Sequence, residues 1–271
     1  MSTRRKTFRH KLLSRELQFG ISIHASVALL EISAARGMDF AWLDMEHAGF
    51  SIDTIYAAAR ASDAEDLPLL IRVGTDDDFT ISSALDSGVT GVMVPHVSSA
   101  EDAARIVAAA RYAPEGRRSV CPFMRAGRWM GSAGWNDYWP GANEQTVVGV
   151  LIENAEGLSN LEEIIQVPGI DLISIGGTDL SASLGLTART DHSHPQIEQA
   201  KVDTVNLCKK YGKAALNTLV PDENRVDIEM FKKWYAAGFN VFTWPDVALY
   251  AEAVGGSVRR ARLEAEEIEP S

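Results

Sequence analysis

Residues 147–153 read VVGVLIE, an unbroken run of apolar residues and glycine that ends at a carboxylate. A continuous apolar run of this kind is typical of a strand buried on both faces, as strands in a parallel sheet are. A carboxylate at the end of such a run loses much of its hydration, and ionising it is costly unless a partner compensates. The stretch therefore predicts a parallel strand and a compensating charge beside Glu153.

The same pattern recurs along the chain, and stretches with helical periodicity lie between the apolar runs. Two of these stretches begin with a residue that commonly caps helices, Ser51 and Ser99. Eight strands alternating with helices predict an α/β protein with a (β/α)8 TIM barrel, and a doubly wound open sheet is the alternative. The expected strands are 19–23, 40–44, 68–73, 91–96, 147–153, 171–177, 214–219 and 240–245.

Length and composition indicate a globular protein with a substantial core. The chain has 271 residues, an apolar fraction of 46% and a formal net charge of −11. Barrels of this length form one domain, and no linker divides the chain, so residues 1–271 are expected to form a single domain. The negative charge argues against nucleic acid as a partner, and no stretch is long enough to cross a membrane.

The start of the chain and its cysteines indicate a cytoplasmic protein. The basic segment RRKTFRHK has no apolar core behind it and so lacks the composition of a signal peptide. Cys121 and Cys208 stand far apart and do not have the spacing of metal ligands. Both are expected to remain reduced thiols.

The interval 113–146 interrupts the rhythm of strands and helices. It is rich in Gly, Arg, Trp and Asn and shows little periodicity. A loop this long in a compact domain is commonly a lid over a pocket or an interface with another subunit. Its aromatic residues fit either role, and they are Trp129, Trp135, Tyr138 and Trp139.

Polar residues stand at the ends of most predicted strands. In a barrel these ends meet at one face, where the chemistry of the fold is carried. The set contains acids, an arginine and histidines but no lysine, which disfavours a Schiff-base mechanism. Its members are His24, Asp44, Glu46, His47, Arg72, His96, Glu153, Asp179, Asn217 and Trp244.

Glu153 and Asp179 are the candidate metal ligands. They end neighbouring strands, so both carboxylates could reach one ion, and Gly176 and Gly177 allow the backbone to approach a ligand closely. Oxygen ligands favour Mg²⁺ or Mn²⁺, and Co²⁺ is also admitted. In the alternative interpretation Asp179 only caps the helix that begins in TDLSASLG.

His47 is the candidate proton-transfer group, because Asp44 is close enough to orient its ring and raise its basicity. Arg72 would stabilise a developing oxyanion as a fixed cation, and its alternative role is a salt bridge to a nearby acid. For His96 the interpretation as a core histidine is weighed against a role in the site, and the roles of His24 and His96 stay open.

Four motifs occur in order along the chain, within a similarity that runs from about residue 17 to 250: FAWLDMEH, IRVG, GVMVPHVSSAEDAARIVAAARYAPEGRRSV and GVLIENAEGLSNLEEIIQVPGIDLISIGGTDLSASLG. Together they resemble the HpcH/HpaI aldolase family, class II pyruvate aldolases related to the citrate lyase β-chain and to macrophomate synthase. The resemblance implies a barrel with a divalent metal on Glu153 and Asp179, a catalytic His47–Asp44 pair and Arg72 on the keto oxygen. It also implies a homohexamer, a trimer of dimers in which the C-terminal helix swaps between subunits.

The chain departs from the family pattern at several positions of the site. Met45 replaces the glycine usual between the two acids, and GGTDLS replaces GPADLS. Leu151 stands where a glutamine is common. The substrate is nevertheless expected to contact Arg72, Gly176, Gly177, Thr178, Leu151 and Trp244.

The activity implied by the resemblance is cleavage of a 4-hydroxy-2-oxo acid to pyruvate and an aldehyde through a metal-stabilised enolate. One alternative is decarboxylation of oxaloacetate, or condensation of its enolate as in macrophomate synthase. A further alternative is a barrel that binds a keto acid without turning it over. The aldehyde, the pathway and the preferred metal stay open.

Overall fold

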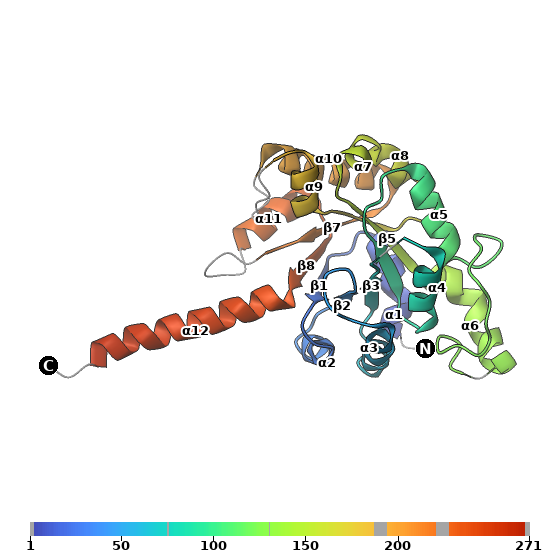
Figure 1. Ribbon diagram of the computed structural model, residues 1–271, viewed down its shortest axis with the longest axis horizontal. Helices are drawn as coiled ribbons and strands as arrows, with labels where there is room; N and C mark the ends of the chain where they lie inside the picture. Colours follow the sequence, from blue (N-terminus) through green and yellow to red (C-terminus); the bar gives the residue numbers. More distant parts are fainter. Residues whose placement is uncertain (1–2, 75, 130, 187–193, 221–227, 269–271) are drawn as a thin grey trace.

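The computed structural model describes residues 3–74, 76–129, 131–186, 194–220 and 228–268. Parallel strands form a closed barrel in chain order, and the last strand pairs with the first (Figure 1). The predicted (β/α)8 TIM barrel is confirmed. Its strands are β1 (Gln18–Ile23), β2 (Phe40–Asp44), β3 (Leu69–Arg72), β4 (Gly91–Val94), β5 (Val147–Ile152), β6 (Leu172–Ile175), β7 (Ala214–Thr218) and β8 (Val241–Pro245).

Helices surround the barrel. Both predicted caps are present, because Ser51 Oγ accepts from Thr54 N and Ser99 Oγ accepts from Asp102 N. The helices of the described residues are α1 (Thr3–Leu13), α2 (Ala28–Ala35), α3 (Ile52–Ala64), α4 (Asp78–Asp86), α5 (Ala100–Ala110), α6 (Gly131–Gln145), α7 (Ala155–Ser159), α8 (Leu161–Gln166), α9 (Gly177–Ser183), α10 (Pro195–Tyr211), α11 (Ile228–Ala237) and α12 (Asp246–Ile268).

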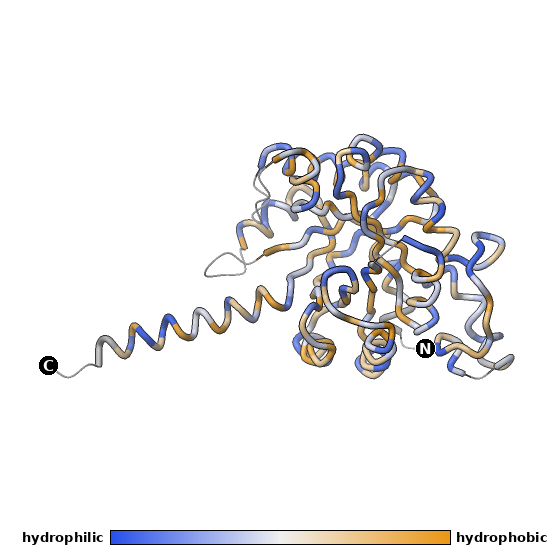
Figure 2. Tube along the Cα trace, viewed as in Figure 1, coloured by the Kyte–Doolittle hydropathy of each residue, from blue (hydrophilic) through white to orange (hydrophobic). Residues whose placement is uncertain are grey.

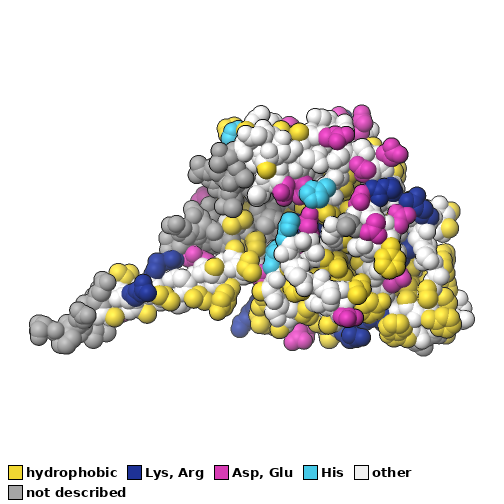
Figure 3. Space-filling view, in the orientation of Figure 1, with side chains coloured by type: hydrophobic (Ala, Val, Ile, Leu, Met, Phe, Trp, Pro, Cys, Tyr) yellow, Lys and Arg dark blue, Asp and Glu magenta, His cyan; other side chains and the backbone are white. Residues whose placement is uncertain are grey.

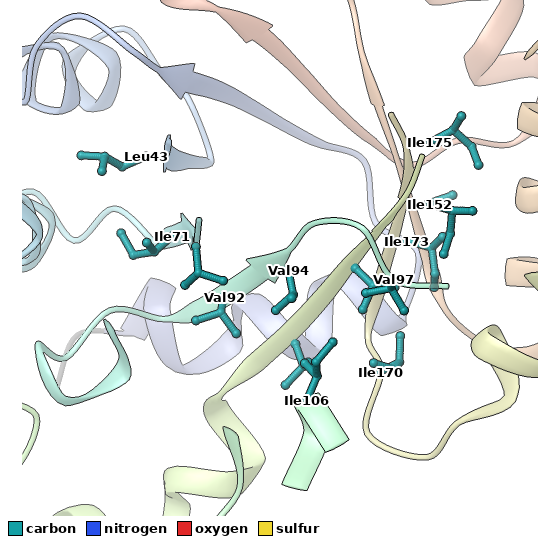
Figure 4. Close-up of a cluster of buried hydrophobic side chains, with 14 of the residues drawn as sticks. Leu43, Ile71, Val92, Val94, Val97, Ile106, Ile152, Ile170, Ile173 and Ile175 are labelled. Carbon is teal, nitrogen blue, oxygen red and sulfur yellow. The ribbon is translucent and has the colours of Figure 1, made fainter. Parts of the chain in front are cut away.

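Side chains along each strand alternate between the barrel interior and the layer beneath the helices. Aliphatic side chains of the outer layer, such as Ile71 and Val92, belong to one buried cluster with Ile106 of α5 (Figure 4). Trp42, Leu70 and Leu151 belong to the separate cluster that fills the interior. The same alternation places the residue two positions after each of them on the interior side, namely Asp44, Arg72 and Glu153.

The amino-terminal end of the barrel is closed by α1. Phe8 and Leu12 of this helix are fully buried in the interior cluster, and the ring of Phe8 lies 5.2 Å from that of Phe40. Because apolar side chains fill the barrel interior at this end, a ligand can enter the interior only at the carboxyl-terminal ends of the strands.

The interval expected to be a long loop contains a helix, α6, and this part of the expectation is wrong. The helix lies against α1, and Arg9 Nη1 donates to the Glu144 carbonyl at 3.3 Å. Packing compensates for its weak periodicity, because aromatic rings of α6 surround Tyr112, with Trp139 at 4.7 Å. The helix ends directly before β5, so these aromatics lie near the closed end and do not cover the open one.

Helix α12 projects from the barrel over most of its length (Figure 1). Apolar and polar residues alternate along it (Figure 2), and Val247, Tyr250, Val254 and Val258 are exposed. No helix in the described ranges is both long and apolar enough to span a membrane.

Candidate active site

Asp44 and Arg72 form a two-point ion pair at the open end of the barrel. They are partners in the β2–β3 register, and Arg72 Nε and Nη2 lie 2.8 and 2.5 Å from the two oxygens of Asp44. Burial would raise the pKa of Asp44, but hydrogen bonds from His24 and Arg72 hold that pKa well below its usual range. The guanidinium also lies 5.4 Å from the ring centre of Trp42. Arg72 is therefore a fixed cation in the site.

His24 lies between two carboxylates at the junction of β1 and β8. Its Nε2 is 3.3 Å from Asp44 Oδ2, and its Nδ1 is 3.4 Å from Asp246 Oδ1. Asp246 also accepts hydrogen bonds from the backbone N–H groups of His24 and Ala25. Burial would lower the pKa of His24, but the bonds with Asp246 and Asp44 raise it to about 9.

Asp246 was not among the predicted site residues. Its only sequence signal is its position directly after the last strand, where an acid also serves as an ordinary first-turn residue of a helix.

His47 lies at the mouth of the site with its side chain 60% exposed. Its contact with Asp44 is through the backbone, where His47 N donates to Oδ1 at 3.4 Å. The nearest carboxylate of the ring is Glu46, with Nε2 and Oε2 3.7 Å apart. The structure thus brings the ring of His24, and not the ring of His47, to the carboxylate of Asp44.

Glu46, His96 and Glu153 form a second cluster beside the ion pair. His96 Nε2 lies 3.0 Å from Glu46 Oε1, and His96 Nδ1 lies 3.1 Å from Glu153 Oε1. Glu46 is also held by Arg72 Nη1 at 3.2 Å. The side chain of His96 is 58% exposed, so the interpretation of His96 as a core histidine is wrong.

Glu153 is the most deeply buried acid of this cluster, with a side chain 2% exposed. Burial raises its pKa, a hydrogen bond from the His96 backbone opposes the shift, and the charges of Glu46 and Asp179 raise the pKa further. Glycine at 176 leaves the space that the carboxylate occupies, because a Cβ there would lie 2.4 Å from Glu153 Oε2.

Asp179 is exposed in the first turn of α9, close enough to Glu153 for the two charges to repel. The residue at the N-cap is Gly176, which makes no side-chain capping bond, so the interpretation of Asp179 as a helix cap is wrong. Two carboxylates held near each other, one of them without its hydration, are a donor set that suits a divalent cation. Acidic and histidine side chains gather at the middle of this face in Figure 3.

Not every residue expected at the substrate lies in the site. Leu151 lines the interior below Glu153, and Gly177 and Thr178 begin α9. Trp244 is paired with Ile21 and stacks on Phe19 at 5.8 Å in the outer layer, a position that gives no support to its predicted contact with the substrate. Asn217 of β7 pairs in register with Phe242 of β8, which belongs to the outer layer, so Asn217 lies on the outer side as well.

Residues 22–242 match the family described as HpcH/HpaI aldolase/citrate lyase. The chain belongs to this family. It is 36% identical over 226 residues to the hydroxypyruvate/pyruvate aldolase of Roseobacter denitrificans, a match that covers 83% of this chain and 86% of that protein. It is 33% identical over 250 residues to the 2-keto-3-deoxy-L-rhamnonate aldolase of Klebsiella pneumoniae, covering 91% and 90% of the two chains.

A solved structure of an HpcH/HpaI aldolase/citrate lyase family protein from Burkholderia cenocepacia has the same architecture. The TM-score is 0.85 at 28% identity, and the alignment covers 95% of this chain and 99% of the other. As a member of the HpcH/HpaI family, the protein is an enzyme of the carbon–carbon lyase class.

Proposed function

We propose that the protein is a divalent-metal-dependent aldolase that cleaves a 4-hydroxy-2-oxo acid to pyruvate and an aldehyde. The observation that carries the proposal is the buried carboxylate of Glu153 beside Asp179, at the face where Asp44 fixes Arg72. The relatives named as aldolases of hydroxypyruvate and of a 2-keto-3-deoxy sugar acid support the same reaction class.

Glu153 and Asp179 would hold the cation, which is Mg²⁺, Mn²⁺ or Co²⁺ in this proposal. When bound, the ion would supply Lewis-acid polarisation of the 2-keto oxygen of the substrate. The backbone N–H groups of Gly177 and Thr178, at the start of α9, face the same end of the barrel and would bind the substrate carboxylate.

Arg72 would stabilise the negative charge that develops on the keto oxygen. Its Nε and Nη2 are engaged by Asp44, so the guanidinium is already oriented and needs no reorganisation during the reaction. Leu151 provides an apolar wall below the site, in place of a side chain that could hydrogen-bond to the substrate.

His47 would accept the proton of the C4 hydroxyl, since its exposed ring stands at the mouth where the distal part of a substrate enters. The C3–C4 bond then breaks, its electron pair forms the enolate of pyruvate, and C4 leaves as the aldehyde. Return of a proton to C3 completes pyruvate. His47 reaches the substrate in this proposal without a ring contact to Asp44.

The test is pyruvate release by the full chain with added Mn²⁺, using a panel of 4-hydroxy-2-oxo acids. Glu153→Ala and Asp179→Ala are expected to lose at least about 1,000-fold in kcat/KM. Glu156→Ala, which removes an exposed acid of α7, is the matched control and should retain activity. Undiminished turnover in the first two variants would overturn the proposal. Oxaloacetate belongs in the panel, because loss of CO₂ without aldol cleavage would identify a decarboxylase instead.

We also propose that α12 packs on another subunit in a homohexamer, as the family resemblance implies. The exposed apolar residues along the helix support this, because contiguous apolar surface of this kind commonly marks an interface. Sedimentation of the full chain should give a hexamer, and Tyr250→Asp with Val254→Asp should dissociate it. A monomeric wild-type protein would contradict the proposal.

A further inference from the structure

His96 follows β4 and is held in an uncommon backbone conformation, with φ of +57°. A non-glycine residue in the left-handed region costs free energy, so it persists only where surrounding contacts fix it. The contacts here are with Glu153, because the His96 backbone N–H donates to Oε1 at 2.6 Å. The same carboxylate oxygen lies 3.1 Å from His96 Nδ1.

The ring of His96 has a carboxylate oxygen at each nitrogen, with Glu46 at Nε2 and Glu153 at Nδ1. A neutral imidazole carries one N–H and one lone pair. If Nε2–H donates to Glu46, the Nδ1 lone pair faces a lone pair of Glu153 at 3.1 Å. The two lone pairs repel unless a proton or a metal ion lies between them.

The spacing of these two atoms suits two ligands of one ion. Adjacent ligands of an octahedral ion, each about 2.1 Å from the metal, are about 3.0 Å apart. Glu46 supplies the second requirement of a metal-binding histidine, a carboxylate that accepts from its other nitrogen and fixes the ring. Glu46 is itself held by Arg72 Nη1 at 3.2 Å, so the ring is oriented by a fixed group.

We propose that His96 is a third protein ligand of the cation held by Glu153 and Asp179. It binds through Nδ1, and Glu46 orients it. The inference rests on the proposed metal-dependent function and goes beyond it by naming a nitrogen ligand. An imidazole ligand increases the preference of a site for Co²⁺ over Mg²⁺ relative to a site made only of oxygen ligands. His96 therefore gives this site a preference for Co²⁺ over Mg²⁺.

The test measures metal binding directly, by calorimetric titration of the full chain with Co²⁺ and with Mg²⁺. His96→Asn and His96→Gly both tolerate the left-handed backbone, so they remove the imidazole without new strain. Each is expected to lose about 10- to 100-fold in Co²⁺ affinity and much less in Mg²⁺ affinity. His10→Asn, at an exposed histidine of α1, is the control and should bind both ions as the wild type does.

A spectroscopic measurement gives a second readout. The Co²⁺ protein should show a paramagnetically shifted, exchangeable N–H resonance from the ligated imidazole, and the resonance should be absent in His96→Gly. Unchanged Co²⁺ affinity in both His96 variants would overturn the inference, with a proton between Nδ1 and Glu153 as the explanation. If the wild type binds Co²⁺ and cleaves oxo acids in that case, the proposed function survives; if it binds neither ion, both fail.

Discussion

The imidazole of His24 bridges two acids that come from opposite ends of the chain, with Nε2 3.3 Å from Asp44 and Nδ1 3.4 Å from Asp246. Asp44 also accepts a hydrogen bond from Arg72, the cation proposed to act on the substrate. Contacts through Asp44 and His24 therefore link Arg72 to Asp246, the first residue of α12. The protonation state of His24 therefore affects both acids and, through Asp44, the position of Arg72.

His24 should titrate far above an ordinary histidine. Its pKa is raised from 6.5 to about 9 by the two carboxylates, against the effect of burial. A raised histidine pKa stabilises the folded state fully below pH 6.5, and the contribution is lost as the pH rises through about 9. We expect the NMR titration of the His24 ring to have its midpoint near 9 and Asp246→Asn to lower it. A midpoint near 6.5 in the wild type would contradict the bridge.

Arg72→Lys should lower kcat although it conserves the charge. A lysine ammonium cannot bond both oxygens of Asp44 as the guanidinium does, so the cation is no longer fixed where charge develops. We expect a loss of about 100-fold in kcat with a smaller change in KM. Arg117→Lys, at an exposed pair with Asp78, is the control. Equal kinetic constants for the Arg72 variant would show that its orientation is unimportant.

Gly176→Ala should weaken metal binding. The new Cβ would lie 2.4 Å from Oε2 and 2.6 Å from Cβ of Glu153, so the carboxylate must move. We expect divalent-ion affinity to fall at least about 10-fold and stability to fall by about 1–3 kcal/mol. Gly256→Ala, where the nearest atom is 3.8 Å from the added Cβ, should bind the ion normally. Normal affinity in the Gly176 variant would separate this glycine from the metal site.

Asp171→Asn should affect stability and leave catalysis unchanged. Asp171 is buried directly before β6, 2.8 Å from Arg9 Nη2 and 3.2 Å from Arg111 Nη2. Its neutralisation removes the salt-bridge partner of the buried Arg111, and we expect a loss of about 3 kcal/mol in chemical denaturation. The kcat of the folded variant should equal that of the wild type, because this pair lies at the closed end of the barrel. A changed kcat would indicate coupling between the two ends.

The strands were predictable because a buried parallel strand needs an unbroken apolar run, and each run from FGISI to NVFTWP forms one. Which polar residues stand at the strand ends was also predictable, because each follows directly on an apolar run. Asp44, Arg72 and Glu153 each lie two positions after an interior apolar residue, so alternation carries them into the site.

A list of strand ends does not say which face of the barrel each side chain occupies. Trp244 and Asn217 fall on the outer face, and the register with β1 and β8 makes this clear only once the barrel is closed. The ring partners of Asp44 and His96 depend on side chains that are distant in sequence, so periodicity could not predict them.

Helix α6 was missed because Pro140 and several glycines lower its helix propensity, and packing against Tyr112 and α1 overrides this low propensity.

The seam between β1 and β8 has a consequence for biosynthesis. The hydrogen bond from His24 to Asp246 joins residues 222 positions apart, whereas Arg72 and Asp44 are separated by 28. A nascent chain can form the Arg72–Asp44 pair early, but the His24–Asp246 bond must wait until β8 and Asp246 have left the ribosome. A translation product that stops before residue 246 therefore lacks the acid that holds His24, however well its earlier strands have folded.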